Sequence, residues 1–335
     1  MSAMIEGLVS VIIPAYNREN MLPEAVGSVL HQTYPHVEII IVNDGSTDGT
    51  RRVADELAVR HPDRIRAIHQ VNRGAGPARE AGRQLARGEF IQYLDSDDLL
   101  LPGKFAWQVA ALRQRPDCGA SYGFIRLIHE DGRILDRPYK GSADEMDYLF
   151  PRMLYDRWWN TDCALFRRSV CDAVGAWSDL RYSQDWEYDA RVGALNVRLA
   201  GVKDYVCVQR QHAGVRQTGH GKWLHPKDQI RFFQSLYDCA VKAGVSSSSR
   251  EMQHFARWLF FASREAALRR EPDAAASLLA LAISCAGSAS RQMKWFSRLC
   301  RVTGWHSGAV IANLAHRVSG RRHGADTLRQ SWMRN

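Results

Sequence analysis

Residues 8–17 read Leu-Val-Ser-Val-Ile-Ile-Pro-Ala-Tyr-Asn, an apolar run that ends in polar side chains. Three more short apolar runs cover residues 37–42, 65–70 and 90–94, and each also ends in a polar segment. Continuous apolar runs of this length are typical of strands buried on both faces of a parallel sheet. The four runs therefore predict the strands of a mainly parallel sheet.

The segments between these runs have helical periodicity. Leu22 and Val26 begin an apolar stripe, and similar patterns cover residues 48–60 and 76–87. Another helix is expected to begin at Pro102, because proline favours the first turn of a helix. The alternation of strands and helices predicts βαβ units, and hence an α/β fold with helices flanking the sheet.

Beyond residue 118 the pattern is less regular. Strand-like stretches cover residues 120–128, 134–139 and 205–208. From about residue 225 the sequence becomes helical almost throughout, with no internal repeat. The helices expected in this region cover residues 227–243, 250–270, 273–286 and 290–302. We therefore expect a boundary near residue 224, with an α-helical extension after it.

The charge of the chain is unevenly distributed. Residues 225–335 contain 17 Lys or Arg and 7 Asp or Glu, whereas residues 1–224 contain 28 and 29. Such asymmetry indicates that the C-terminal region meets an anionic surface, either a membrane or a nucleic acid. No nucleic-acid recognition motif accompanies the charge, so nucleic acid is not the expected partner.

The segment 290–302 has the pattern of an amphipathic helix that lies on a membrane surface. Basic residues fall on one side of it, namely Arg291, Lys294, Arg298 and Arg301, and apolar residues on another, namely Trp295, Leu299 and Val302. The alternative is a packed helix with a solvated basic face.

The composition, with 45% apolar and 24% charged residues, is that of an ordinary folded protein. The best candidate for a membrane span, residues 274–289, is shorter than a bilayer requires, and the first residues lack the features of a signal peptide. A cytoplasmic protein is therefore expected, with possible peripheral attachment at the inner face of the membrane. The seven cysteines contain no C-x-x-C pair, so we expect reduced, mostly buried thiols rather than disulfides or zinc.

Ligands of such sheets bind where the strands end, so the loops after the first strands are the candidate site. In the first loop Tyr16 could stack on a base and Asn17 offers a donor and an acceptor, although a helix cap explains them equally simply. In the second loop Asp44 could accept hydrogen bonds from a base or ribose. A structural turn is the alternative there.

The third loop, Asn72-Arg73-Gly74-Ala75-Gly76-Pro77-Ala78-Arg79, combines glycines that permit close backbone approach with arginines that suit phosphate. It is not the G-x-G-x-x-G motif that follows the first strand of dinucleotide-binding proteins. A nicotinamide or flavin enzyme is therefore disfavoured.

The fourth loop, Asp95-Ser96-Asp97-Asp98, packs three carboxylates into four residues. Their repulsion must be offset by a cation or by hydrogen-bond donors. Mg²⁺ and Mn²⁺ bind through such carboxylates together with substrate phosphates. The alternative is an acidic helix start that Asp98 caps.

Together these motifs resemble the family 2 glycosyltransferases, and the resemblance extends from about residue 9 to about residue 218. Its marks are Val11-Ile12-Ile13-Pro14-Ala15-Tyr16-Asn17, Val42-Asn43-Asp44-Gly45-Ser46-Thr47-Asp48, Asn72-Arg73-Gly74 with Ala78-Arg79, and Tyr93-Leu94-Asp95-Ser96-Asp97-Asp98. The resemblance implies a GT-A fold, which is Rossmann-like, and an inverting enzyme that uses nucleotide-diphosphate sugars.

The resemblance also assigns roles to residues. It implies that the nucleotide-sugar site contains Pro14, Tyr16, Asn17, Glu19, Asp44, Asn72, Arg79, Asp95 and Ser96. A divalent cation, Mn²⁺ or Mg²⁺, is expected on Asp97 of this D-x-D motif, with His212 completing its coordination. The cation would stabilise negative charge on the leaving nucleoside diphosphate.

On the acceptor side, the segment Ser183-Gln184-Asp185-Trp186 resembles the family's Glu-Asp-aromatic motif, with Gln184 in place of the glutamate. The resemblance makes Asp185 the general base that takes the proton of the acceptor hydroxyl. Loss of the neighbouring charge is expected to lower the pKa of Asp185. Trp158, Trp159 and Trp186 are candidate acceptor-binding residues, with buried core aromatics as the alternative for the first two. Arg216 and Thr218 are candidates for a loop that closes over the diphosphate.

The sequence thus predicts a catalytic domain over residues 1–224, with a nucleotide-binding half over about residues 1–100 and an acceptor-binding half over about residues 101–224. A basic helical region over residues 225–335 follows. The expected activity is transfer of a hexose or N-acetylhexosamine from a nucleotide sugar, with UDP favoured, to a glycan or glycolipid hydroxyl in cell-envelope polysaccharide or glycolipid synthesis. A catalytically silent nucleotide-sugar-binding protein or scaffold is the alternative. A sugar nucleotidyltransferase is disfavoured because its glycine-rich loop is absent after the first strand.

Overall fold

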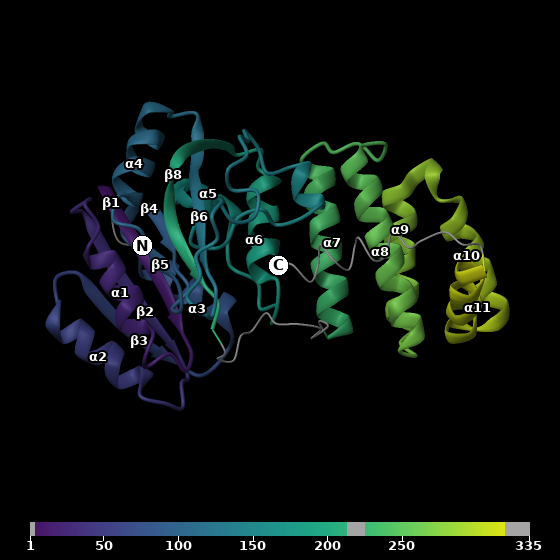
Figure 1. Cartoon of the computed structure of the whole chain (residues 1–335), viewed down its shortest axis with the longest axis horizontal. Coiled ribbons are helices and arrows are strands. Elements are labelled where there is room, and N and C mark those ends of the chain that lie inside the picture. The colour runs from purple at the N-terminus through teal and green to yellow at the C-terminus, as the bar shows by residue number, and fades with distance from the viewer. Residues whose placement is uncertain (1–3, 213–224, 319–335) are drawn as a thin grey trace. The chain divides into compact units, whose positions relative to one another are not determined.

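The computed structural model describes residues 4–212 and 225–318, and the chain forms two compact units within them (Figure 1). One unit comprises residues 4–149 and 157–212, and the other comprises residues 150–156 and 225–318. The first unit contains the sheet and the second is helical. The sequence did not indicate that residues 150–156 belong to the helical unit. The expected loop residues Arg216 and Thr218 lie outside the described residues.

The N-terminal half of the first unit is the parallel part of the sheet. Its strands and helices are β1 (Ile5–Ala15), α1 (Leu22–Leu30), β2 (Val37–Asp44), α2 (Thr50–Arg60), β3 (Ile65–Gln70), α3 (Ala75–Leu85) and β4 (Gly88–Tyr93). Strand β1 lies between β2 and β4, and β2 lies between β1 and β3, all in parallel pairs. Every residue of β2 is buried. The parallel strand pairs, with a helix between successive strands, confirm the α/β fold.

The second half of this unit completes an eight-stranded sheet of order β3-β2-β1-β4-β7-β6-β8-β5. Its elements are β5 (Leu99–Leu100), α4 (Lys104–Gln114), β6 (Cys118–Ile128), β7 (Leu165–Arg167), α5 (Arg168–Val174), α6 (Gln184–Gly193) and β8 (Arg198–Arg210). The short β7 pairs antiparallel with both β4 and β6, so strand direction changes there. Because β1 to β4 run parallel to one another, their carboxyl ends form one edge of the parallel part.

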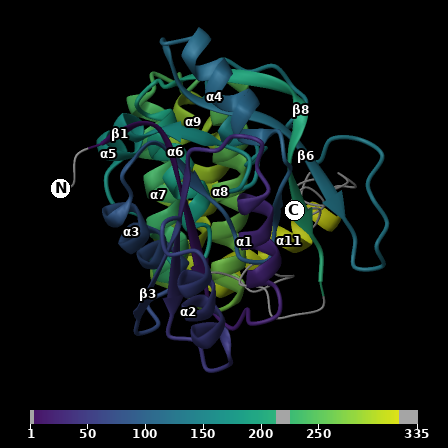
Figure 2. The ribbon, with the colours of Figure 1, turned by 90° about the vertical axis from the view of Figure 1, so that its left-hand side faces the viewer.

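Helix α3 packs tightly on the sheet at Gly82. A Cβ atom at this position would lie 2.5 Å from Cγ2 of Ile12 on β1 and 3.2 Å from Cγ2 of Val42 on β2. Any side chain would therefore push the helix away from the sheet. Figure 2 views the parallel part from the side that carries α2 and β3. The close packing fixes the start of α3 beside the loops that follow the strands.

One predicted strand is wrong. Residues 134–139 form no strand, and Ile134 makes only an isolated bridge to Ile128 at the end of β6. Ile134 is 52% exposed, so no second layer covers an apolar face there. Strand β8, by contrast, is longer than the expected residues 205–208, because much of its first half is exposed and lacks an apolar run.

The second unit, within its described residues, contains two short 3₁₀ helices and a set of α-helices. These are η1 (Arg152–Leu154), α7 (Pro226–Lys242), α8 (Arg250–Leu268), α9 (Pro272–Ala286), η2 (Gly287–Ala289), α10 (Arg291–Thr303) and α11 (Trp305–Val318). An aromatic core joins α7 to α8, where the Phe233 ring lies 5.9 Å from Phe255 and 4.9 Å from Trp258. The sequence predicted the first four α-helices and missed α11.

Helix α10 buries a face that the sequence analysis did not single out. Met293, Phe296 and Cys300 face the interior. Trp295 and Val302, on the apolar side expected to meet a membrane surface, are 52% and 85% exposed. The reason is that spacings of three and four residues from Met293 define a face of their own. The exposed face of α10 therefore combines apolar and basic side chains.

Helix α9 with the turn after it, Pro272–Ala289, is long and apolar enough to cross a membrane by length and composition alone. In this structure α9 packs against α8, and the Ser263 hydroxyl donates a hydrogen bond to the Ala275 carbonyl over 2.7 Å.

The seven cysteines are unpaired and buried, as predicted.

Candidate active site

The loops after β1 and β2 are tied together by Asn17. Its side-chain oxygen accepts a hydrogen bond from the backbone N–H of Thr47 over 2.8 Å, and its own backbone N–H donates to Oγ of Ser46 over 3.0 Å. Asn17 has a φ of 53°, a left-handed conformation that asparagine tolerates better than most residues. Asn17 thus organises the site, and its predicted contact with the nucleotide stays a prediction.

Asp44, at the end of β2, holds the loop after β3. Its buried carboxylate accepts hydrogen bonds from Nε2 of Gln70 over 2.7 Å, from the N–H of Arg73 over 2.9 Å and from the N–H of Gly74 over 2.8 Å. A Cβ atom at Gly45 would lie 2.5 Å from the backbone nitrogen of Asn72. Asp44 is therefore a structural clamp as well as the residue predicted to face the base.

The other predicted donor-site residues of the first loop differ in accessibility. Pro14 is buried within β1, while Tyr16 is 40% exposed just beyond the strand. The Glu19 carboxylate accepts a hydrogen bond from the N–H of Gly49 over 2.8 Å at the start of α2. There the Asp48 carboxylate accepts from the N–H of Thr50 over 2.9 Å. In the third loop Asn72 is exposed.

The three aspartates of the fourth loop have three different partners. Asp95 pairs with Arg79, whose Nη2 lies 2.6 Å from Oδ1. Asp97 pairs with Arg18, with Nη2 and Oδ2 3.1 Å apart, and its Oδ2 also lies 3.0 Å from Nε2 of His212. Asp98 accepts a hydrogen bond from the N–H of Arg210 over 2.8 Å, so it binds β8 rather than capping a helix. Ser96 between them is buried.

The surroundings of these three carboxyls shift their pKa values in different directions. Burial opposes ionisation of Asp97, but the Arg18 charge and the His212 hydrogen bond outweigh it and lower its pKa. Burial raises the pKa of Asp95 despite the Arg79 charge. Burial and the nearby Asp162 raise the pKa of Asp98 well above its usual value. Asp97 is therefore the member of the loop that is most firmly held as an anion.

Asp162 joins this cluster from a distant part of the chain. Carboxylate oxygens of Asp95, Asp98 and Asp162 lie within 4.8 Å of one another. Asp162 also accepts hydrogen bonds from the N–H of Asp95 over 2.7 Å and from Nδ2 of Asn160 over 2.9 Å. Burial and the Asp95 charge raise the pKa of Asp162 to about 7. The cluster thus concentrates acid groups that a cation would help to ionise.

The predicted metal ligands Asp97 and His212 meet in the structure through a hydrogen bond of 3.0 Å between Oδ2 and Nε2. The same Oδ2 lies 3.1 Å from Nη2 of Arg18. A carboxylate oxygen and an imidazole nitrogen are ligand types that manganese accepts. The chemistry of the pair therefore suits a divalent ion, which would take the place of the hydrogen bond between them.

Arg79 is buried beside the cluster with unused donors. Its guanidinium lies over the Trp177 ring, 4.7 Å from the ring centroid, and Trp177 stacks on Tyr188 at 4.0 Å. Beyond the bond to Asp95, its Nε and Nη1 have no hydrogen-bond partner among the described residues. Both nitrogens are covered by protein, so in this structure Arg79 acts on the cluster through its ion pair with Asp95 and its charge.

Asp185 lies in the first turn of α6, where the helix dipole favours an anion. Its Oδ2 lies 2.6 Å from Nη1 of Arg157, and its side chain is 25% exposed. Burial opposes ionisation, but the charges of Arg157 and Arg79 lower its pKa. The direction agrees with the expectation, but the charges of Arg157 and Arg79, rather than the change at residue 184, are its cause. Gln184 is buried, and its Oε1 has no partner among the described residues.

Two predicted acceptor-binding residues belong to the core instead. Trp158 and Trp159 are 3% and 1% exposed, and their rings lie 5.1 Å apart. The Trp159 indole N–H donates to Oδ2 of Asp189 over 2.9 Å. A sugar cannot stack on rings that are covered by protein, so the core alternative is correct for this pair in this structure. Trp186 is only partly buried.

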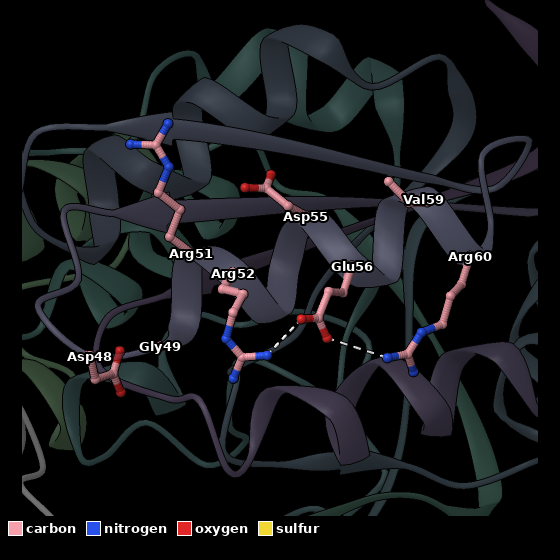
Figure 3. Close-up of a pocket in the computed structure, with 8 residues that line it drawn as sticks. All are labelled: Asp48, Gly49, Arg51, Arg52, Asp55, Glu56, Val59 and Arg60. Atoms are coloured by element: carbon pink, nitrogen blue, oxygen red, sulfur yellow. Dashed lines mark hydrogen bonds and ion pairs between the residues drawn. The ribbon is translucent and has the colours of Figure 1, made fainter.

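A surface hollow on the outer side of α2 is separate from this chemistry (Figure 3). It is lined by Asp48, Gly49, Arg51, Arg52, Asp55, Glu56, Val59 and Arg60. Glu56 pairs with Arg52 over 2.6 Å and with Arg60 over 3.3 Å, within the same helix. Three of its charged side chains, Arg52, Glu56 and Arg60, thus pair with one another on an open helix surface.

Comparison with known proteins identifies the class. Residues 10–175 match the family model described as glycosyl transferase family 2. The chain belongs to this family through that segment. It is 34% identical over 174 residues to the chondroitin synthase of Escherichia coli, a match that covers 50% of this chain and 25% of that protein. Matches to this and other curated relatives span between 18% and 51% of the relatives' own length.

Solved structures share the fold. TarS from S. aureus, in complex with UDP-GlcNAc, superposes with a TM-score of 0.68 at 18% identity, covering 92% of each chain. The mannosyltransferase PcManGT from Pyrobaculum calidifontis, in complex with GDP-Man and Mn²⁺, superposes with a TM-score of 0.51 at 22% identity, covering 94% of this chain and 88% of that one. The expected GT-A-type α/β fold is thus confirmed.

Sequence reasoning missed several residues of this site. Arg18, Arg157 and Asp162 each make an ion pair or hydrogen bond to a predicted residue. Asp162 and Arg157 lie in an irregular segment between η1 and β7, where no periodicity marks them. The sequence signal that could have indicated them is the presence of two charged residues, Arg157 and Asp162, close to the aromatic pair Trp158-Trp159.

Proposed function

We propose that the chain is an inverting glycosyltransferase that moves a sugar from a nucleotide-diphosphate sugar to the hydroxyl of a glycan or glycolipid. The observation that carries this proposal is the meeting of the acidic loop and the acceptor-side carboxylate. Asp95 and Asp185 are ninety residues apart in sequence, yet one short segment contacts both: Asp162 accepts a hydrogen bond from the N–H of Asp95 over 2.7 Å, and Nη1 of Arg157 lies 2.6 Å from Oδ2 of Asp185. This arrangement supports a donor site and a base that are neighbours.

The donor is proposed to bind over the loops after β1 to β4. Tyr16 is exposed enough to stack on a base, and the positive charge of buried Arg79, which pairs with Asp95, favours an anionic diphosphate nearby. Glu19, Asn17, Asp44, Asn72 and Ser96 complete the proposed site. A UDP-sugar is our first choice, supported by the UDP-GlcNAc bound in the TarS structure. A hexose or an N-acetylhexosamine is the proposed group transferred.

A divalent ion, Mn²⁺ or Mg²⁺, is proposed to be held by Asp97 and His212. When bound, it would stabilise the charge of the leaving nucleoside diphosphate. Arg18 holds Asp97 from the opposite loop, and Arg210 donates from Nε to the Asp97 carbonyl over 2.6 Å. These contacts would orient the Asp97 carboxylate before the donor arrives. The Mn²⁺ in the PcManGT structure supports this choice of ion.

Asp185 is proposed to be the general base. It would accept the proton of the acceptor hydroxyl while the oxygen attacks the anomeric carbon on the side opposite the diphosphate. A low pKa keeps this carboxyl ionised at neutral pH, which the role requires. The exposed part of its side chain allows an acceptor to approach.

The test is a thermal-shift panel of UDP, GDP, dTDP and CMP, each with and without Mn²⁺, on the whole chain. A ligand stabilises the state that binds it, so one nucleoside diphosphate should raise the melting temperature more with Mn²⁺ than without. A catalytically silent binding protein would give the same shift but release no nucleotide from the matching sugar donor. Absence of any shift and any release would contradict both functions.

A membrane surface is the proposed partner of the C-terminal helices. Arg291, Lys294, Arg298 and Arg301 are exposed on α10, which contains no Asp or Glu. Residues 287–335 contain nine Lys or Arg and one Asp. Exposed Trp295 and Val302 lie on the same helix, and aromatic side chains favour the membrane interface. Attachment to anionic lipid at the cytoplasmic face would bring a glycolipid acceptor or cell-envelope polysaccharide within reach.

Vesicle co-sedimentation tests the partner. The whole chain should bind vesicles with anionic phosphatidylglycerol at least tenfold better than neutral phosphatidylcholine vesicles, since each basic residue at the surface contributes about fivefold. Arg291→Gln with Arg298→Gln should reduce binding, while Arg250→Gln, on the exposed start of α8, should change it less. Equal binding to both vesicles, or preference for duplex DNA over vesicles, would overturn the proposal.

A further inference from the structure

Arg157 joins two carboxylates of α6. Its Nη1 lies 2.6 Å from Oδ2 of Asp185, and its Nε lies 2.7 Å from Oδ2 of Asp189, one helical turn further on. Nη2 donates to Oγ1 of Thr161 over 3.4 Å. The Arg157 side chain is 9% exposed, so all three nitrogens are used inside the protein. No sequence motif had marked this residue.

The two aspartates have unequal surroundings. Asp189 is buried, and the Trp159 indole N–H holds the same oxygen that binds Arg157. Asp185 is partly exposed, and its carboxylate also accepts a hydrogen bond from the N–H of Trp186 over 2.9 Å. Arg157 is therefore anchored to the core through Asp189 and reaches outward to Asp185.

We propose that Arg157 is a positioning residue for Asp185, which it holds in one rotamer, as a carboxylate, facing the acceptor side of the site. The inference rests on the proposed role of Asp185 as general base. A guanidinium is planar and always charged, and its rigid fork bonds two carboxylates in one fixed geometry, whereas an ammonium is a point charge on a flexible stem. The i, i+4 spacing of the aspartates presents both on one face of α6.

A purely structural role explains this arrangement less well. Buried ion pairs contribute little net stability, because desolvation offsets their attraction, and apolar residues often replace them without loss. A cluster of ion pairs kept only for packing would not need one of its two carboxylates, Asp185, to be partly exposed to solvent. The acceptor proton must go to an oxygen in a fixed place, and a fixed geometry is what positioning supplies.

Several charged groups act on Asp185 and decide the pH dependence. Arg157 from the preceding segment, Arg79 from α3 and Lys140 from the segment after β6 favour its ionised form. Asp95 after β4 and Asp189 on α6 oppose it. Removal of Arg157 leaves two of the three cations, so Asp185 should still ionise, but at higher pH.

The test measures donor turnover by the whole chain with Mn²⁺ for wild type, Arg157→Met, Arg157→Lys and Asp185→Asn. The matched control is Arg191→Met, which removes an arginine of α6 that pairs with Glu187 over 2.8 Å and donates to the Val174 carbonyl rather than to Asp185 or Asp189. For Arg157→Met we expect kcat to fall at least tenfold with an unchanged donor KM. The acid limb of the kcat–pH profile should move up by about one pH unit or more. Arg157→Lys should recover part of both effects, and Arg191→Met should show neither.

The outcomes separate this inference from the proposed function. Loss of turnover in Asp185→Asn, with wild-type kcat and acid limb in Arg157→Met, would overturn the positioning role alone. No donor turnover in any variant, including wild type, would overturn the proposed function and this inference with it. If Arg157→Met does not fold, as judged by its melting transition, Arg157→Lys decides. An unchanged kcat and acid limb in that variant overturn the inference.

Discussion

Replacement of Asp44 by asparagine tests whether this residue holds the nucleotide-site loops in place. Asparagine has the same shape, but it offers one oxygen where aspartate offers two. In the structure one oxygen accepts from Gln70 and the N–H of Arg73, and the other accepts from the N–H of Gly74. With the amide oxygen in the first position, the amide nitrogen would face the Gly74 N–H at about the original 2.8 Å.

The expected loss of stability follows from these three hydrogen bonds. One buried donor without a partner costs about 1–3 kcal/mol, and two charge-assisted bonds that become neutral lose about 1 kcal/mol each. We therefore expect the free energy of unfolding to fall by about 3–5 kcal/mol. For a unit of this size that corresponds to a decrease in melting temperature of about 6–20 °C.

The assay is calorimetric melting of the whole chain without nucleotide, so that loss of a ligand contact cannot contribute. Asp55→Asn is the matched control, because the Asp55 side chain is 52% exposed and makes a surface pair with His69 over 2.9 Å. Its melting temperature should change by no more than about 2 °C. If Asp44→Asn also melts within about 2 °C of wild type, the clamp is refuted and only a ligand-binding role remains for Asp44.

Two further predictions concern burial and metal. Burial lowers the pKa of Lys104 from 10.5 to about 8. Between these pH values the unfolded chain holds a proton that the folded chain lacks, so stability should rise with pH. Relative to Lys104→Met, wild type should gain about 3 kcal/mol over this range in urea titrations, and parallel curves would contradict this. For the metal site, the Asp97→Ala substitution or the addition of EDTA should weaken the Mn²⁺-dependent nucleotide affinity, measured by calorimetry, at least tenfold. If Mn²⁺ still strengthens nucleotide binding in Asp97→Ala to the same extent, the metal is held by Asp95 and Asp98 instead.

The parallel half of the fold could be predicted because its strands carry their own signal. Strand β2 is buried on both faces, and its central residues Ile39–Val42 therefore read as an apolar run. The second half carries a weaker signal: the stretches 120–128 and 205–208 indicate β6 and part of β8, but β7, which pairs antiparallel with β4 and β6, spans only Leu165–Arg167. The stretch 134–139 has the composition of a strand, but its neighbours leave Ile134 exposed. Strand pairing there depends on contacts that the local sequence does not contain.

The candidate site was predictable to the extent that its residues follow those strands. The predicted pair Asp97 and His212 lie 115 residues apart in sequence and meet in the structure. Asp162 and Arg157 follow no strand, and their roles depend on the placement of an irregular segment against α6 and the fourth loop. The predicted platform of Trp158 and Trp159 failed for the opposite reason, because an aromatic pair has the same composition in a core as at a surface.

The central claim is sugar transfer that depends on Asp185. Its most direct test is release of nucleoside diphosphate from a panel of UDP- and GDP-sugars with Mn²⁺, in the presence of simple sugar and glycolipid acceptors, by wild type and Asp185→Asn. We predict that wild type releases nucleotide from one donor and forms a product of inverted anomeric configuration. Asp185→Asn should bind that donor with unchanged affinity and release at least a hundredfold less. Equal release by both proteins, or a product of retained configuration, would contradict the account.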